Sequence, residues 1–129
     1  MVTPFGIRTL DRSNPLYKGR LIGHYNKDEA YHSGVAWPWL VGSFIRGYLK
    51  VNGYGEEDRI YLFRNYMKDL LFSLSNGCIG SISELFDGEE PFYPRGCVSQ
   101  AWSVAELLRA LVEDILLIRA PYEEEIMDF

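Results

Sequence analysis

The sequence is short of cysteine and of paired metal-ligand motifs. Its two cysteines, Cys78 and Cys97, have no CxxC spacing. A zinc site built from both thiols with His24 and His32 is formally possible, but the usual ligand spacings are absent. Two thiols without a signal peptide are typical of a protein of the reducing cytoplasm. We therefore expect a cytoplasmic protein with no metal site and no cofactor.

Other absences exclude whole classes of function. The chain has 13 Lys and Arg against 18 Asp and Glu, a net charge of −5, and no Lys/Arg-rich run. Binding to nucleic acid or to an anionic membrane surface is therefore not expected. No apolar run approaches the roughly 20 residues of a membrane span. A βαβ pattern, a glycine-rich phosphate loop and an internal repeat are also missing.

What the sequence does contain is helical periodicity in three segments, near residues 38–50, 56–75 and 100–118. Gly42 and Gly47 in the first segment predict the close approach of another helix. The pattern predicts an all-α fold with three principal helices and long functional loops. We divide a single domain, 1–129, into an ordered loop region (1–31), a helical core (32–118) with an acidic loop (80–98), and an acidic tail (119–129).

The segment 100–118 is apolar around most of its circumference, which is typical of a helix buried on several sides. Three helices cannot easily cover one of their own number in this way. We therefore expect the chain to associate, most simply as a twofold homodimer.

Two clusters of residues have the chemistry of a functional site. The acidic loop carries four carboxylates followed by aromatic residues, and His32, Trp37 and Trp39 gather at the start of the first helix. Aromatics make up 15% of the chain. Rings that stack on sugars, together with carboxylates that move protons, are what a carbohydrate site needs. The alternatives are an acidic surface loop, a structural histidine and an aromatic-rich core.

Three segments together resemble the C-terminal glucosidase domain of glycogen debranching enzymes, the amylo-α-1,6-glucosidase type. They are TPFGIRTL (3–10), AYHSGVAWPWLVGSF (30–44) and ISELFDGEEPFYPRGCVSQAWSVAELLR (82–109). They occur in the family's order and spacing, and the resemblance runs from about Thr3 to Ile118. It implies part of an (α/α)6 toroid and inverting hydrolysis of α-1,6-linked glucose in glycogen-type α-glucans.

The resemblance also implies roles for individual residues. Glu84 matches the position of the general base. Substrate binding is expected from His32, Trp37, Trp39, Gln100, Trp102, Arg95 and Asp87, with Arg95 also expected to brace the acidic loop by pairing with Asp87, Glu89 or Glu90.

The family's general acid, an aspartate, lies upstream of TPFGIRTL and has no counterpart in this sequence. Whether the isolated chain is an enzyme therefore stays open. One reading is the C-terminal portion of an α-1,6-glucosidase whose upstream-encoded half supplies the acid. The other is a non-catalytic, oligomeric glucan-binding or structural half-toroid.

Overall fold

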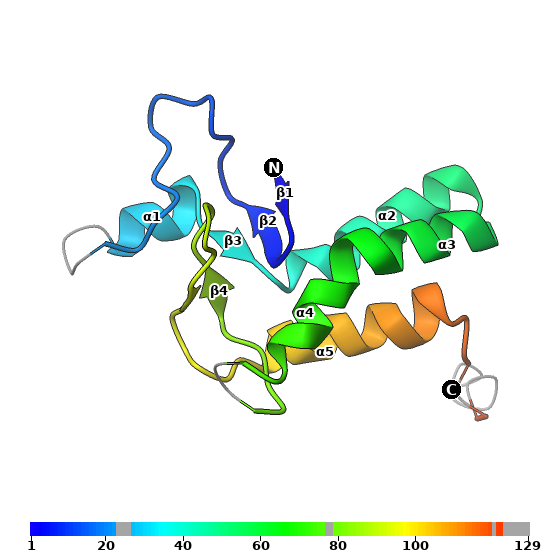
Figure 1. The fold of residues 1–129 in the computed structure, drawn as a ribbon. Coiled ribbons are helices and arrows are strands. Elements are labelled where there is room, and N and C mark those ends of the chain that lie inside the picture. The colour runs from blue at the N-terminus through cyan, green and yellow to red at the C-terminus, as the bar shows by residue number, and fades with distance from the viewer. Residues whose placement is uncertain (23–26, 77–78, 120, 123–129) are drawn as a thin grey trace.

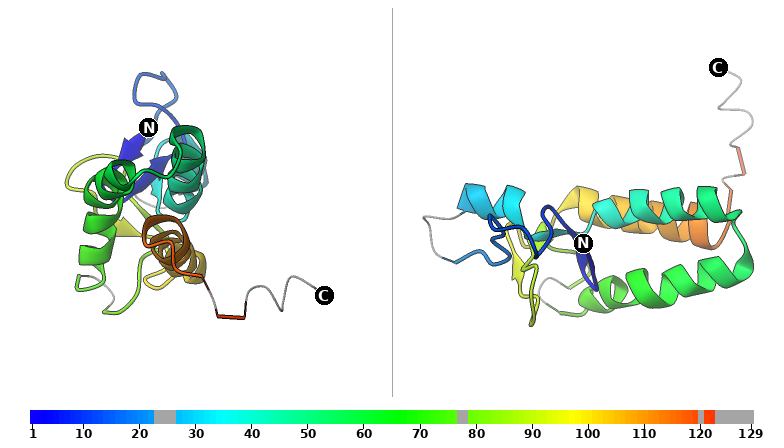
Figure 2. Two further views of the ribbon diagram at one scale, coloured as in Figure 1. Left: turned by 90° about the vertical axis from the view of Figure 1, so that its right-hand side faces the viewer. Right: turned by 90° about the horizontal axis from the view of Figure 1, so that it is seen from above.

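The long helices lie toward one end of the molecule and a small sheet toward the other (Figures 1 and 2). The computed structural model describes residues 1–22, 27–76, 79–119 and 121–122. His24, Cys78 and most of the acidic tail lie outside the described residues.

Helices occupy the three predicted segments. The first is α2 (Leu40–Asn52), and the third is α5 (Ala101–Arg109) continued by the π-helical turn η3 (Ala110–Ile115). The second is one helical stretch of three parts, α3 (Glu56–Leu62), η2 (Phe63–Met67) and α4 (Lys68–Ser73). Figures 1 and 2 show that α2 and α5 run in the same direction. The α3–α4 stretch runs in the opposite direction, from the end of α2 back toward the start of α5. Within the described part of the chain, no helix has the length and apolar composition needed to cross a membrane.

The structure also contains a five-stranded antiparallel sheet in the order β1-β2-β3-β4-β5. Its strands are β1 (Val2–Thr3), β2 (Gly6–Arg8), β3 (Ala36–Trp37), β4 (Leu85–Phe86) and β5 (Pro94–Arg95). The prediction of an all-α fold forming part of a toroid is therefore wrong. Strands of two or three residues are too short for the alternating pattern, over four to eight residues, by which a sequence reveals a strand.

A further short helix, α1 (Lys27–Ser33), precedes β3. It lies in a stretch that sequence reasoning divided between the loop region and the core. Seven residues give barely two helical turns, too few for a clear apolar stripe. Its position is important because it carries Tyr31 and His32 beside the sheet (Figure 1).

The apolar core forms between the helices. Its main cluster unites residues of all three long helical stretches with two from the segment that leads into and forms β4; the buried members are Val41, Ile45, Leu49, Leu62, Met67, Leu70, Ile82, Phe86, Leu107, Ala110 and Ile115. A second, much smaller cluster of Ala30, Val35 and Leu85 joins α1 to the sheet. The apolar cluster between the sheet and α1 is therefore much smaller than the cluster between the long helices.

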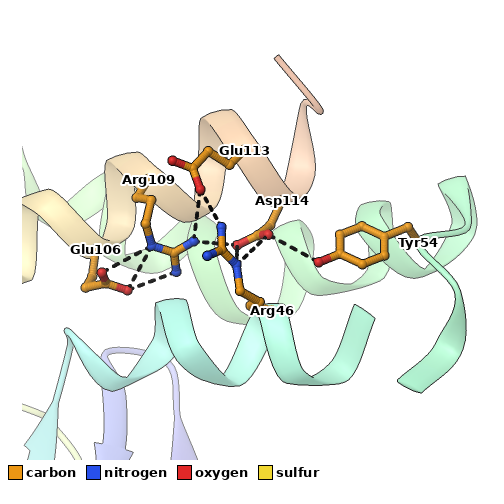
Figure 3. Close-up of polar contacts among 6 residues, drawn as sticks. All are labelled: Arg46, Tyr54, Glu106, Arg109, Glu113 and Asp114. Atoms are coloured by element: carbon orange, nitrogen blue, oxygen red, sulfur yellow. Dashed lines mark hydrogen bonds and ion pairs between the residues drawn. The ribbon is translucent and has the colours of Figure 1, made fainter. Parts of the chain in front are cut away.

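An ion-pair network fixes α5 and η3 on α2 (Figure 3). The Arg109 guanidinium donates to the Glu106 carboxylate at 2.9 Å and to the buried Asp114 carboxylate at 2.8 Å. Arg46 of α2 donates to Asp114 at 3.1 Å and also to Glu113. The hydrogen bonds to Glu106, and then to Asp114, raise the pKa of Arg109 above its ordinary value. All four charged side chains of α5 and η3 therefore take part in this network.

Candidate functional site

Glu84 lies directly before β4 and is held by the chain that returns beside it. Its backbone N–H donates to the carbonyl of Cys97 at 2.9 Å, and the N–H of Cys97 donates to Glu84 Oε2 at 2.9 Å. The hydroxyl of Tyr31, from α1, donates to the same Oε2 atom at 3.3 Å. The half-buried carboxylate is thus anchored through one of its two oxygens.

Gly96 makes room for this carboxylate. Its φ of +70° lies in the left-handed region, which favours glycine. A Cβ at this position would lie 2.9 Å from Cβ of Glu84 and close to its carboxylate oxygen. The glycine that turns the chain is therefore also the residue that lets Glu84 reach the N–H of Cys97.

Four aromatic rings lie in a continuous row that begins at Tyr31, the residue that donates to Glu84. The Tyr31 ring meets the Trp37 ring edge-on at 5.5 Å between centroids. Trp37 meets Trp102 edge-on at 5.9 Å, and Trp102 lies 6.0 Å from Trp39. The Trp37 indole N–H donates to the Tyr31 carbonyl, which joins β3 to α1. We call Tyr31, Trp37, Trp102 and Trp39 the aromatic row.

Tyr31 is the site residue that sequence reasoning missed. It lies within the AYHSG motif, immediately before His32, and an aromatic residue inside a recognised motif is the signal that could have found it. Burial, followed by the neighbouring Glu84 carboxylate, raises the pKa of the Tyr31 phenol above its ordinary value. The phenol is already protonated at neutral pH, and the raised pKa extends its role as a donor to Glu84 into more alkaline solution.

The other predicted substrate-binding residues are placed less closely around Glu84. His32 is exposed on α1 and, among the described residues, takes no part in the contacts of Glu84 or of the aromatic row. Gln100 precedes α5, where its N–H donates to the carbonyl of Ile82 at 2.9 Å. Its half-buried side chain lies two residues before Trp102.

Asp87 and Arg95 pair with each other. The Arg95 guanidinium donates to both oxygens of the buried Asp87 carboxylate, at 3.1 and 2.9 Å, and the N–H of Leu21 donates to Asp87 at 3.2 Å. Of the three partners that the sequence left open for Arg95, namely Asp87, Glu89 and Glu90, the structure pairs it with Asp87. Hydrogen bonding to Asp87 raises the pKa of Arg95. Both carboxylate oxygens of Asp87 are thus used in bracing the acidic loop.

Two arginines of the N-terminal region also bind the acidic loop. Arg8 donates to the carbonyl of Gly88 at 2.6 Å, and Arg20 donates to the carbonyl of Glu90 at 2.8 Å. Arg20 also forms an ion pair with Glu89 at 3.4 Å. The acidic loop is therefore held in place by these hydrogen bonds and ion pairs, although Glu90 and several residues after it are exposed.

The described residues contain no group of three or more His, Cys, Asp and Glu side chains that could hold a metal ion. Of the four residues weighed for a zinc site, His24 and Cys78 lie outside the described residues. Cys97 is a free, exposed thiol, and its contribution to the site comes from its backbone N–H.

A held carboxylate beside a row of aromatic rings is a composition typical of carbohydrate sites. The family model described as amylo-alpha-1,6-glucosidase matches residues 1–109 of the 129. The chain therefore belongs to the amylo-alpha-1,6-glucosidase family, as a partial, C-terminal glucosidase-like domain related to glycogen debranching enzymes. The resemblance that the three sequence motifs indicated is confirmed. No solved structure matches the chain.

Proposed function

We propose that this chain provides the base side of an inverting α-1,6-glucosidase site, with Glu84 activating the attacking water. The observation that supports this role is the one-sided anchoring of the carboxylate. Among the described residues, both donors to the Glu84 side chain, the Tyr31 hydroxyl and the Cys97 N–H, bond to Oε2. Oε1 is then the oxygen that accepts a proton from water, while Oε2 keeps the carboxylate oriented.

The aromatic row supplies the second element of the proposal. Trp102 is about half exposed at the start of α5, and its ring lies between those of Trp37 and Trp39. Large rings with an exposed face bind the apolar face of a glucose unit. We therefore propose an α-glucan as the ligand, with a glucose unit stacked on Trp102 and its anomeric carbon directed toward Glu84.

Inversion requires a second carboxyl group, roughly 6.5–9.5 Å from the base, to protonate the leaving oxygen. We assign that acid to none of residues 1–129, and in this proposal it comes from a further segment of the glucosidase domain, on the same or another polypeptide. We also place the protein in the cytoplasm, because a free exposed thiol such as Cys97 is typical of a reducing compartment.

A glucan-binding role without hydrolysis is the second candidate. The observation that favours it is the pairing of two of the acidic loop's three other carboxylates, the third being the exposed Glu90. Asp87 is buried against Arg95, and Glu89 is paired with Arg20. Carboxylates fixed in this way are poorly placed to act as the missing acid, so the chain alone would hold sugar without cleaving it.

Glu84→Gln separates chemistry from binding. The amide oxygen can accept the bonds that Oε2 accepts now, so the fold and the sugar site are expected to persist. Because an amide cannot take a proton from water, glucose release from an α-1,6-branched dextrin should fall by roughly 10²–10⁴-fold. The assay uses the chain mixed with a polypeptide that carries the upstream half of the domain, and isomaltose affinity is measured by calorimetry in parallel.

Two further variants make this experiment specific. Glu90→Gln changes an exposed carboxylate of the same loop and should leave both rate and affinity unchanged. Trp102→Ala should weaken isomaltose binding at least about fivefold, as expected for loss of an anchoring aromatic residue. Binding without any glucose release in the mixture would favour the second candidate. Absence of binding by the unmodified chain would contradict both.

A further inference from the structure

The short helix α1 carries the phenol that bonds to Glu84, yet it is too short to hold its own position. It has seven residues, and isolated helices of fewer than about 12 residues are marginal in water. Ala30 is its buried residue, and a single small side chain provides little packing. Contacts from outside α1 must therefore place the Tyr31 hydroxyl beside the Glu84 carboxylate.

Donors from outside α1 bind the carbonyl groups of its last turn. The backbone N–H of Lys18 donates to the Ser33 carbonyl at 2.6 Å, and the indole N–H of Trp37 donates to the Tyr31 carbonyl at 3.1 Å. The last four carbonyl groups of a helix have no partner within it, so such bonds determine where the last turn lies. The bond from Trp37 acts on Tyr31 itself.

Trp37 is in turn fixed by the sheet. It belongs to β3, the middle strand, where it lies opposite Ile7 of β2, and its neighbour Ala36 lies opposite Phe86 of β4. A Cβ on Gly6 would come within 2.7 Å of the Trp37 backbone, so the two strands lie in close contact here. The sheet therefore joins Trp37 to β4, directly after the candidate base.

The Trp37 indole is occupied by protein contacts, whereas Trp102 offers a surface to a ligand. Trp37 meets the rings of Tyr31 and Trp102 edge-on, and it packs on the small apolar cluster that joins α1 to the sheet. Its indole N–H is used by the Tyr31 carbonyl. Trp102, in contrast, is 47% exposed. The two tryptophans therefore suit different roles.

We propose that Trp37 is a positioning residue, whose indole N–H holds the last turn of α1 so that the Tyr31 hydroxyl stays on Oε2 of Glu84. Sequence reasoning expected Trp37 to bind substrate, and in this proposal sugar stacking belongs to Trp102. The hydroxyl lies 3.3 Å from Oε2, a long hydrogen bond that a small shift of α1 would break. The catalytic consequence of this inference rests on the function proposed above for Glu84.

The test replaces Trp37 by benzothienylalanine, in which a sulfur atom takes the place of the indole N–H while the ring keeps its size. Burial, followed by Glu84, raises the pKa of Tyr31 in the unmodified chain. Without the Trp37 hydrogen bond the phenol should leave Glu84, so the Tyr31 pKa should fall toward its ordinary value in an NMR titration of isotope-labelled tyrosine. The same replacement at Trp39, which contacts Trp102 at the far end of the row, is the control and should leave the Tyr31 pKa unchanged.

Kinetics in the mixture with the upstream half of the domain measure the catalytic consequence. The kcat for glucose release should fall roughly five- to tenfold, the factor that one ordinary hydrogen bond represents, while isomaltose affinity should change less than about twofold. In a Tyr31→Phe background the same replacement should lower kcat by less than about twofold, because the hydroxyl through which Trp37 acts is already absent.

Trp37→Phe is a second variant that keeps an aromatic ring without the N–H donor, and it should lower the Tyr31 pKa in the same direction. A Tyr31 pKa unchanged in both Trp37 variants would overturn the proposal. Isomaltose affinity weakened more than about fivefold by benzothienylalanine would also overturn it, since Trp37 would then contact the sugar. The titration uses this chain alone, so it decides the positioning of Tyr31 even if the mixture releases no glucose, a result that would contradict the function proposed for Glu84 instead.

Discussion

Gly96 is the residue whose replacement should most directly disturb the candidate base. It has φ +70° and faces Glu84, whereas Gly80 has φ +77° and no atom within 4 Å of an added Cβ. Both Gly→Ala substitutions pay the cost of a left-handed backbone, about 1–2 kcal/mol. Gly96→Ala should cost a further 1–3 kcal/mol or so, because its Cβ must displace Glu84. Urea unfolding of the two variants measures the difference.

This comparison isolates the contact with Glu84, because the backbone strain is common to both variants. Equal loss of stability would show that Glu84 moves aside at no cost and that Gly96 serves only the turn. In the expected case, Gly96→Ala should also weaken any glucose release more than Gly80→Ala does.

Tyr31 should make the free energy of unfolding depend on pH in the alkaline range. Its pKa is raised in the folded state by burial and by Glu84, whereas an unfolded tyrosine has a pKa of about 10. Below pH 10 both states keep the proton and the stabilisation is complete. As pH rises from 10 through the folded-state pKa, the unfolded state loses its proton first, so stability falls.

Tyr31→Phe removes this titration together with the hydrogen bond to Glu84. The free energy of unfolding should therefore be lower for Tyr31→Phe than for the unmodified chain at pH 8, and the gap should narrow between pH 10 and 11. Urea unfolding at pH steps of 0.5 provides the measurement. A gap that stays constant over this range would contradict the raised pKa.

At the scale of elements, the two glycines of α2 have different roles although both lie in one helix. An added Cβ on Gly42 would lie 3.0 Å from the Glu106 carbonyl oxygen and 3.1 Å from Nη2 of Arg109, whereas on Gly47 it would meet nothing within 4 Å. The predicted close approach of another helix is confirmed for Gly42 and wrong for Gly47. Gly42 is thus a point at which α5 lies close to the α2 backbone.

Alanine at these two positions should act in opposite directions. Gly47→Ala should stabilise the protein by about 0.5–1 kcal/mol through helix propensity alone. Gly42→Ala should destabilise it by about 1–3 kcal/mol, because the new methyl group displaces the ion-pair network of α5. Thermal or urea unfolding shows the signs, and destabilisation by Gly47→Ala would mean that an exposed helix position is constrained from outside the chain.

At the scale of the whole molecule, the helices and the sheet differ in how much core supports them. Ile45 and Leu49 of α2 lie fully buried in the main cluster, whereas the separate cluster beneath the sheet has only Ala30, Val35 and Leu85. Amide hydrogens of Ile45 and Leu49 should therefore exchange at least about tenfold more slowly than those of β1 and β5, which open locally.

Hydrogen exchange followed by mass spectrometry or NMR measures this difference. Equal protection of α2 and of the edge strands would show that the molecule opens as one cooperative unit. If isomaltose binds as proposed, its addition should raise protection around β4 and the start of α5, and leave the C-terminal end of α2 unchanged.

Sequence alone determined the long helices and the family. Apolar residues at helical spacing predict a helix from the local sequence alone. The motifs around Trp37 and Glu84 are contiguous strings, so they can be recognised without a structure. The sequence also indicated that Arg95 pairs with a carboxylate of its own short loop, but it left Asp87, Glu89 and Glu90 open, and the structure shows that the partner is Asp87.

Only the tertiary structure decided the sheet, the anchoring of Glu84 and the side of α5 that faces α2. Each of these depends on residues that are distant in sequence: Ala36 pairs with Phe86, and Tyr31 reaches Glu84 across 53 positions. Two-residue strands carry no pattern of their own, because backbone hydrogen bonds to a remote partner form them. In the same way, the sequence showed that residues 100–118 are apolar around most of the helix. Which side of that helix faces α2 is seen only in the structure, where Arg46 pairs with Glu113 and Asp114.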